Sequence, residues 1–162
     1  MMLKRLAVWL TAVVTTVVGL GLATSGPAAA DPVPEELGRW VAYGNTPPPI
    51  HGPSLWACSE TRNVASDGSV IAQVCAVRTV NGQGVQGAVI IRNNQPGLYG
   101  TEVAFRLQDG IGRQTIRWVC PRSGVASRTW SVCYGRTFPE IFHAWIFESG
   151  ANGTKLYESP PV

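Results

Sequence analysis

The stretch TEVAFRLQDGIGRQTIRWVC, residues 101–120, decides the fold. Alternating apolar and polar residues flank the turn sequence DGIG at 109–112, and this pattern predicts a β-hairpin. The four-residue loop sets Val103 opposite Trp118 on an apolar face and leaves a polar face on the other side. A helix would mix the two faces, so the stretch favours two antiparallel strands.

A second hairpin is predicted upstream, where residues 69–80 and 85–92 flank the turn sequence NGQG. The same counting sets Val77 opposite Ala88. Both faces of this strand pair are apolar, which is typical of central strands covered on two sides.

The last hairpin joins residues 141–149 to residues 154–158 through an Asn-Gly turn, with Glu148 opposite Lys155. About eight short strands with frequent turns are expected over residues 54–162. We therefore predict an all-β fold, an antiparallel β-sandwich with immunoglobulin-like as one candidate arrangement. A small closed β-barrel is the alternative.

The N-terminal part differs in composition. Residues 1–30 combine a basic start, an apolar run and three alanines before Asp31, which predicts a secretory signal peptide, with a retained membrane anchor as the alternative. Residues 31–53 predict a short helix ending at Gly44 and then a proline-rich linker. The disulfide-stabilised β domain is then expected at 54–162.

The composition excludes several classes of protein. Charged residues make up 14% of the 162-residue chain and apolar residues 45%, which excludes wholesale disorder. Two of the 13 basic residues lie in the predicted leader, so 11 remain against 10 acidic residues, a net charge of +1. We therefore expect no nucleic-acid partner and, after cleavage of the leader, no membrane partner.

All four cysteines follow the predicted leader: Cys58, Cys75, Cys120 and Cys133. Export places them in an oxidising compartment, so two disulfides are expected, with three possible connectivities. A short loop at residues 65–68 sets Cys58 directly opposite Cys75 on antiparallel strands. This register favours the local pairing, with Cys120 bridged to Cys133.

Three arginines share the polar face of the first hairpin: Arg106, Arg113 and Arg117. Such a set can bind a sulfate, a phosphate or an acidic sugar, or it forms a solvated face with Glu102 as internal partner. Trp56 and Trp130 lie beside cysteines, where a tryptophan ordinarily packs on a disulfide. If exposed, these rings would instead form a platform for sugars.

Two resemblances add expectations. The segment Cys120-Pro121-Arg122-Ser123 resembles the reactive loop of the secreted subtilisin-inhibitor family, which implies that Arg122 is the specificity residue and Arg122-Ser123 the bond presented to a protease. Residues 56–137 are similar to small secreted two-disulfide β-sandwich proteins of actinomycete type. The second resemblance implies the architecture and no activity.

Residues suited to catalysis are scarce. The sequence carries no common nucleophile, metalloprotease or nucleotide-binding motif and only two histidines, so we expect no metal and no cofactor. His143 with Glu140 or Glu148 is the candidate base of a hydrolase, or else a packed histidine beside an aromatic sheet face. The leading expectation is a secreted, extracellular, non-catalytic binding or interaction domain for a protein or glycan. A serine protease inhibitor and a hydrolase are the alternatives.

Overall fold

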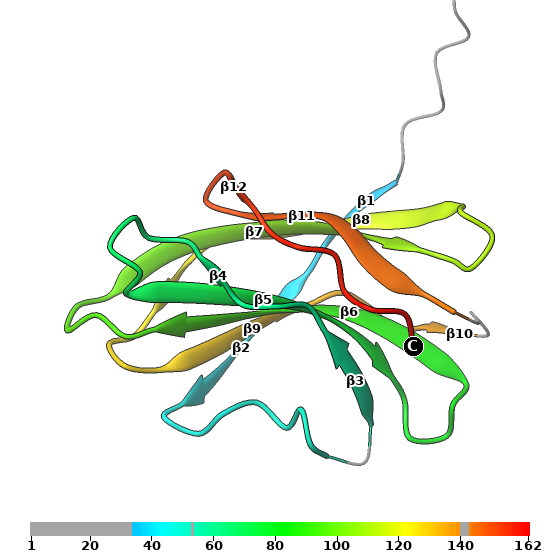
Figure 1. Cartoon of the computed structure of the whole chain (residues 1–162), viewed down its shortest axis with the longest axis horizontal. Coiled ribbons are helices and arrows are strands. Elements are labelled where there is room, and N and C mark those ends of the chain that lie inside the picture. The colour runs from blue at the N-terminus through cyan, green and yellow to red at the C-terminus, as the bar shows by residue number, and fades with distance from the viewer. Residues whose placement is uncertain (1–33, 53, 140–142) are drawn as a thin grey trace, which may run out of the picture. The chain divides into compact units, whose positions relative to one another are not determined.

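The structure is a computed structural model, which describes residues 34–52, 54–139 and 143–162. The predicted leader at 1–30 lies outside the described residues. Within the described part the elements are all strands, and they form two sheets stacked as layers (Figure 1). The sheets are not closed into a barrel, so the prediction of a β-sandwich is confirmed.

Sheet A contains, in spatial order, β1 (Glu35–Leu37), β8 (Gln114–Val125), β7 (Tyr99–Gln108), β11 (Trp145–Ala151) and β12 (Thr154–Lys155). Sheet B contains β2 (Arg39–Gly44), β9 (Trp130–Tyr134), β6 (Gly84–Asn93), β5 (Val70–Arg78) and β3 (Leu55–Cys58). Two short strands complete sheet B, β4 (Arg62–Asn63) beside β5 and β10 (Phe138–Pro139) beside β6. Only the β1–β8 pair of these described strands is parallel.

The main core lies between the sheets. Phe105 on β7 and Trp118 on β8 are fully buried, and their ring centroids lie 5.3 Å apart. Sheet B meets them with small and branched residues, among them Gly87, Val89 and Ile91 on β6. The apolar face predicted for the first hairpin is therefore the inner face of sheet A, as expected from its alternation.

The predicted faces of the first hairpin are correct, but its register is wrong by two residues. Phe105 pairs with Trp118, and Val103 with Cys120 instead of Trp118. One residue of the shift arises at the turn, because the Asp109 N–H donates to the carbonyl of Arg113 and leaves a three-residue loop. The other arises at a bulge beside Leu107. A single slip would have reversed the faces, and the bulge restores them.

The other two hairpins are also shifted by two residues. Val77 pairs with Gln86 instead of Ala88, because the loop occupies residues 80–83 instead of 81–84 and the Thr79 N–H donates to the carbonyl of Gly84. Lys155 pairs with Gly150 and not with Glu148. In this last hairpin the strands continue to the Asn-Gly turn, whose residues have φ of 47° and 76°, as a tight two-residue connection requires.

The helix predicted within residues 31–53 is wrong. Residues 35–44 instead form β1 and β2, so the β domain begins before Ser54. The chain crosses from sheet A to sheet B at Gly38, where a Cβ would lie 2.7 Å from the sulfur of Cys120. Side chains alternate after this crossing, since Trp40 packs toward the main core and Val41 toward the outer face of sheet B. Strand pairing on both sheets has overridden weak helix signals.

Both predicted disulfides are present. Cys58 and Cys75 pair directly across β3 and β5, with their Cα atoms 4.0 Å apart. The bridge between Cys120 and Cys133 joins β8 of sheet A to β9 of sheet B, with a Cα separation of 6.1 Å. One bridge therefore fastens neighbouring strands, and the other holds the two layers together.

Candidate functional site

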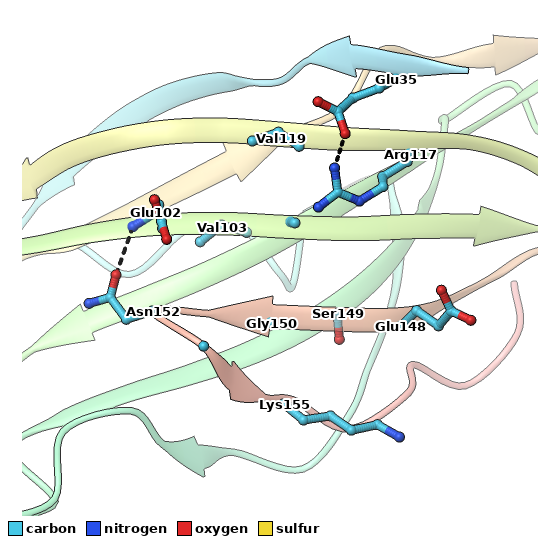
Figure 2. Close-up of a pocket in the computed structure, with 12 residues that line it drawn as sticks. Glu35, Glu102, Val103, Arg117, Val119, Glu148, Ser149, Gly150, Asn152 and Lys155 are labelled. Atoms are coloured by element: carbon cyan, nitrogen blue, oxygen red, sulfur yellow. Dashed lines mark hydrogen bonds and ion pairs between the residues drawn. The ribbon is translucent and has the colours of Figure 1, made fainter. Parts of the chain in front are cut away.

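The outer face of sheet A carries two of the arginines that the sequence singled out. Arg106 and Arg117 lie directly opposite each other on β7 and β8. Arg117 forms an ion pair with Glu35, which Figure 2 shows as a dashed line. The Arg106 guanidinium lies 3.1 Å from a carboxylate oxygen of Glu148. The carboxylate partners are therefore Glu35 and Glu148, and not Glu102 as the sequence predicted.

A groove of about 560 Å³ lies over this face, and Figure 2 shows Glu35 and Arg117 on one side of it and Lys155 on the other. Its floor is made of short side chains of β7 and β11, and Asn152 bonds the backbone at the Glu102 end. Arg117 and Glu148 already have partners of opposite charge. Such an arrangement fits a solvated face of internally paired charges better than a site built to bind an anion.

The remaining arginines lie apart from that pair. Arg113 follows the turn and forms an ion pair with Asp109 at 2.9 Å. Arg122 is exposed and lies within β8, whose residues 123–125 pair with β7. The resemblance to the inhibitor family implied that the Arg122-Ser123 bond lies in a protruding loop. The structure places this bond in a strand of the sheet instead.

Trp130 lies on the other sheet, on the outer face of sheet B. The guanidinium of Arg92 lies 5.0 Å from the centre of its ring. Trp130 packs with the outer apolar cluster that contains Val132, whereas Cys133 faces the main core. The expectation that Trp130 packs on the neighbouring disulfide is therefore wrong, because residues 130 and 133 point to opposite faces of β9.

His143 lies just before β11 and is exposed, with a φ of 52°. The prediction placed it on a strand face, and the structure places it outside the strand. Glu148 is bound to Arg106. Glu140 lies outside the described residues. The structure therefore brings no described carboxylate and histidine together as a general-base pair.

A second groove, which the sequence did not single out, lies on the outer face of sheet B. Its lining residues come from all five main strands of sheet B, in the order β2, β9, β6, β5 and β3, and from the β2–β3 connection. Its volume is about 430 Å³. We call this site the aromatic groove, and its lining residues are Arg39, Val41, Tyr43, Pro49, Ser54, Trp56, Val77, Gln86 and Tyr134.

Aromatic side chains form the walls of this groove. The rings of Trp56 and Tyr134 meet edge to face, with centroids 6.2 Å apart and planes at 73°. The hydroxyl oxygens of Tyr43 and Tyr134 lie 2.7 Å apart and share a hydrogen bond. Burial raises the pKa of Tyr134 well above its usual range, and the hydrogen bond with Tyr43 raises it further. Tyr134 is therefore a neutral hydroxyl at physiological pH.

Polar groups lie at the base and the rim of the aromatic groove. The Gln86 side-chain amide donates a hydrogen bond of 2.6 Å to the carbonyl of Gly135. Arg39 is exposed and lies opposite Tyr134 in the β2–β9 register. Among the described residues, no carboxylate pairs with Arg39. The aromatic groove therefore combines an apolar surface with a cation that has no carboxylate partner among the described residues.

The sequence contains a signal for this site. Val41 and Tyr43 on β2, like Val132 and Tyr134 on β9, are two residues apart and so share one strand face. A helix prediction for residues 31–44 hides the shared face of Val41 and Tyr43. The pattern of Val132 and Tyr134 is that of an ordinary buried strand, so by itself it does not indicate a ligand site. Only the pairing of β2 with β9 brings the two tyrosines together.

Comparison with protein-family models, with curated proteins and with solved structures finds no match to this chain. Across residues 34–52, 54–139 and 143–162, no group of three or more His, Cys, Asp or Glu side chains is placed to hold a metal ion. In the same described part, no helix is long and apolar enough to cross a membrane.

Proposed function

We propose that this chain is an exported, non-catalytic binding domain whose ligand site is the aromatic groove on sheet B. Export is supported by the leader pattern at residues 1–30 and by the two disulfides, which suit an oxidising compartment. The rigid sandwich supports binding without induced ordering, since both layers are fastened by the Cys120–Cys133 bridge.

One observation carries the proposal. The outer face of sheet B, which an ordinary sandwich exposes as a polar surface, presents aromatic rings around a groove of about 430 Å³. Small-molecule sites are concave, mainly apolar and provided with a few polar groups, and they fall in this range of volume. Trp56, Tyr134 and Arg39 supply this combination of groups.

The test is a titration of the disulfide-bonded chain with a panel of glycans and extracellular proteins, with tryptophan fluorescence as the readout of binding. We expect at least one ligand that changes the emission and whose binding is lost in Trp56→Ala. Trp130→Ala is the matched control, because Trp130 lies on the same outer face but does not line the groove. Circular dichroism must show that both variants keep the fold.

Two results contradict the proposal. One is a specific ligand whose binding Trp56→Ala leaves unchanged, because the site then lies elsewhere. The other is turnover of a generic hydrolase substrate that His143→Ala abolishes without loss of the fold, because the chain is then an enzyme.

A further inference from the structure

We infer that the aromatic groove binds an acidic sugar, a pyranose ring that carries a carboxylate. This inference rests on the proposed function and names the class of ligand for the same site. It follows from three properties of the groove: its ring surfaces, its unused hydrogen-bonding groups and its charge.

The ring surfaces come first. The rings of Trp56 and Tyr134 meet edge to face, and both line the groove together with Val77. The two rings therefore offer surfaces of different orientation instead of one flat platform. A pyranose has apolar C–H faces and a polar edge, so it can cover a ring with one side and keep its hydroxyls toward polar groups. A purely apolar ligand would use only the rings.

The unused hydrogen-bonding groups favour a ligand that both donates and accepts. Gln86 uses its amide nitrogen to bond the carbonyl of Gly135, which fixes the orientation of the amide. No donor among the described residues bonds its amide oxygen. Tyr43 and Tyr134 have two hydroxyl protons but share one hydrogen bond, so one proton is left to donate. A sugar hydroxyl can serve both groups, as donor to Gln86 and acceptor from the tyrosine pair.

The charge selects an acidic sugar. Among the described residues that line the groove, Arg39 is the one charged side chain and none is acidic. Arg106, Arg113 and Arg117 have carboxylate partners within the described chain, whereas Arg39 has none there. A guanidinium binds a carboxylate through two parallel hydrogen bonds. A carboxylate on the sugar would supply the partner that Arg39 lacks.

The probes are oligosaccharides of galacturonic, glucuronic and mannuronic acid, titrated calorimetrically into the disulfide-bonded chain at low and high salt. The methyl esters of the same oligosaccharides are the neutral controls, and sulfated neutral oligosaccharides test the kind of anion. We expect at least one uronic acid oligomer to bind about tenfold more tightly than its ester, as one charge-assisted contact implies. High salt should reduce that difference.

Single-residue variants test which side chains bind the sugar and its carboxylate. Arg39→Gln should weaken binding of the acid about tenfold, to the level of the ester, and leave binding of the ester unchanged. Trp56→Ala should abolish binding of both. Arg122→Gln is the matched control, since it removes an exposed arginine of the other sheet and should change neither.

Equal binding of acid and ester, an unchanged affinity in Arg39→Gln, or preference for the sulfated sugars overturns the inference. In each of these cases the proposed function survives if Trp56→Ala still abolishes binding. Failure of every sugar also overturns the inference, and a proline-rich peptide or protein ligand that depends on Trp56 would then keep the proposed function. If no ligand depends on Trp56, both fail.

Discussion

The hydroxyl oxygens of Tyr43 and Tyr134 lie 2.7 Å apart and join β2 to β9 across the outer face of sheet B. Burial and then this hydrogen bond raise the pKa of Tyr134 above its ordinary value of 10.0. Because the folded state holds the proton more tightly than the unfolded state, Tyr134 contributes stability that is complete below about pH 10. That contribution is lost as the pH rises through the raised pKa of Tyr134.

A first prediction follows for alkaline pH. The free energy of unfolding should decline above about pH 10, and Tyr134→Phe should make that decline shallower. Tyr43→Phe should lower the pKa of Tyr134 without restoring the ordinary value, because burial is the larger cause. Urea unfolding over this pH range and near-ultraviolet titration of the phenolates measure both effects. Titration of all tyrosines together near their ordinary value would contradict the prediction.

The hairpins show how far the sequence determines this fold. Alternation assigns Val103 and Trp118 to the inner face, and both are buried there. It does not fix the register, because a bulge beside Leu107 and the true length and position of each turn depend on local hydrogen bonds, such as that from Asp109 to Arg113. A two-residue error keeps every face, so the pattern cannot reveal it.

The site was harder to predict than the fold. Arg106 and Arg117 lie together as expected, but their carboxylate partners come from β1 and β11, which lie far away in sequence. The aromatic groove needs Tyr43 beside Tyr134 and Trp56 facing them. Those contacts depend on the pairing of β2 with β9, which lie far apart in the sequence. The local sequence pattern does not reveal which distant strands pair.

A second prediction concerns Gly87, which lies on β6 beneath the core rings. A Cβ at this position would lie 2.5 Å from Phe105 and 2.7 Å from Ile146. Gly87→Ala should therefore lower the free energy of unfolding by about 1–3 kcal/mol through overpacking. Gly97→Ala is the matched control, because no atom lies within 4 Å of its Cβ. Urea unfolding compares the two variants, and equal stabilities would refute the close packing of Phe105 on this strand.

A third prediction concerns the order in which the disulfides are reduced. Both sulfurs of the Cys120–Cys133 bridge belong to fully buried residues, whereas Cys58 is half-buried on β3, at the end of sheet B. A limiting reductant under native conditions should therefore open Cys58–Cys75 first, because the attacking thiolate needs access to a sulfur. Alkylation and peptide mass mapping identify the opened bridge. Prior opening of Cys120–Cys133 would contradict the prediction.

Losing the bridge between the sheets should also be costly. Replacing Cys120 and Cys133 together by alanine should lower the free energy of unfolding by about 3 kcal/mol on the chain-entropy model for a loop of this length. The two bridges close loops of similar length, with sequence separations of 13 and 17 residues. The entropic costs of losing either bridge should therefore be similar, because the cost depends only on the logarithm of the loop length. Chemical denaturation of each double variant measures them.

A fourth prediction compares two adjacent residues of β8 that point to opposite faces. The side chains of Arg117 and its partner Glu35 are 33% and 57% exposed, so solvent screens their ion pair. Glu35→Gln should lower the free energy of unfolding by about 0.2–1 kcal/mol, and high salt should remove the difference. Trp118 is fully buried between the sheets, and Trp118→Ala should cost about 3–5 kcal/mol at any salt concentration.

Urea unfolding at low and high salt distinguishes the two contributions. A salt-independent loss above about 2 kcal/mol in Glu35→Gln would mean that the pair holds β1 on sheet A as a desolvated contact. The groove beside Arg117 would then be a structural feature of the sheet. A small, salt-sensitive loss instead makes the outer face of sheet A a solvated surface, as the exposure of both side chains indicates, and leaves the stability of the sandwich to its core and its disulfides.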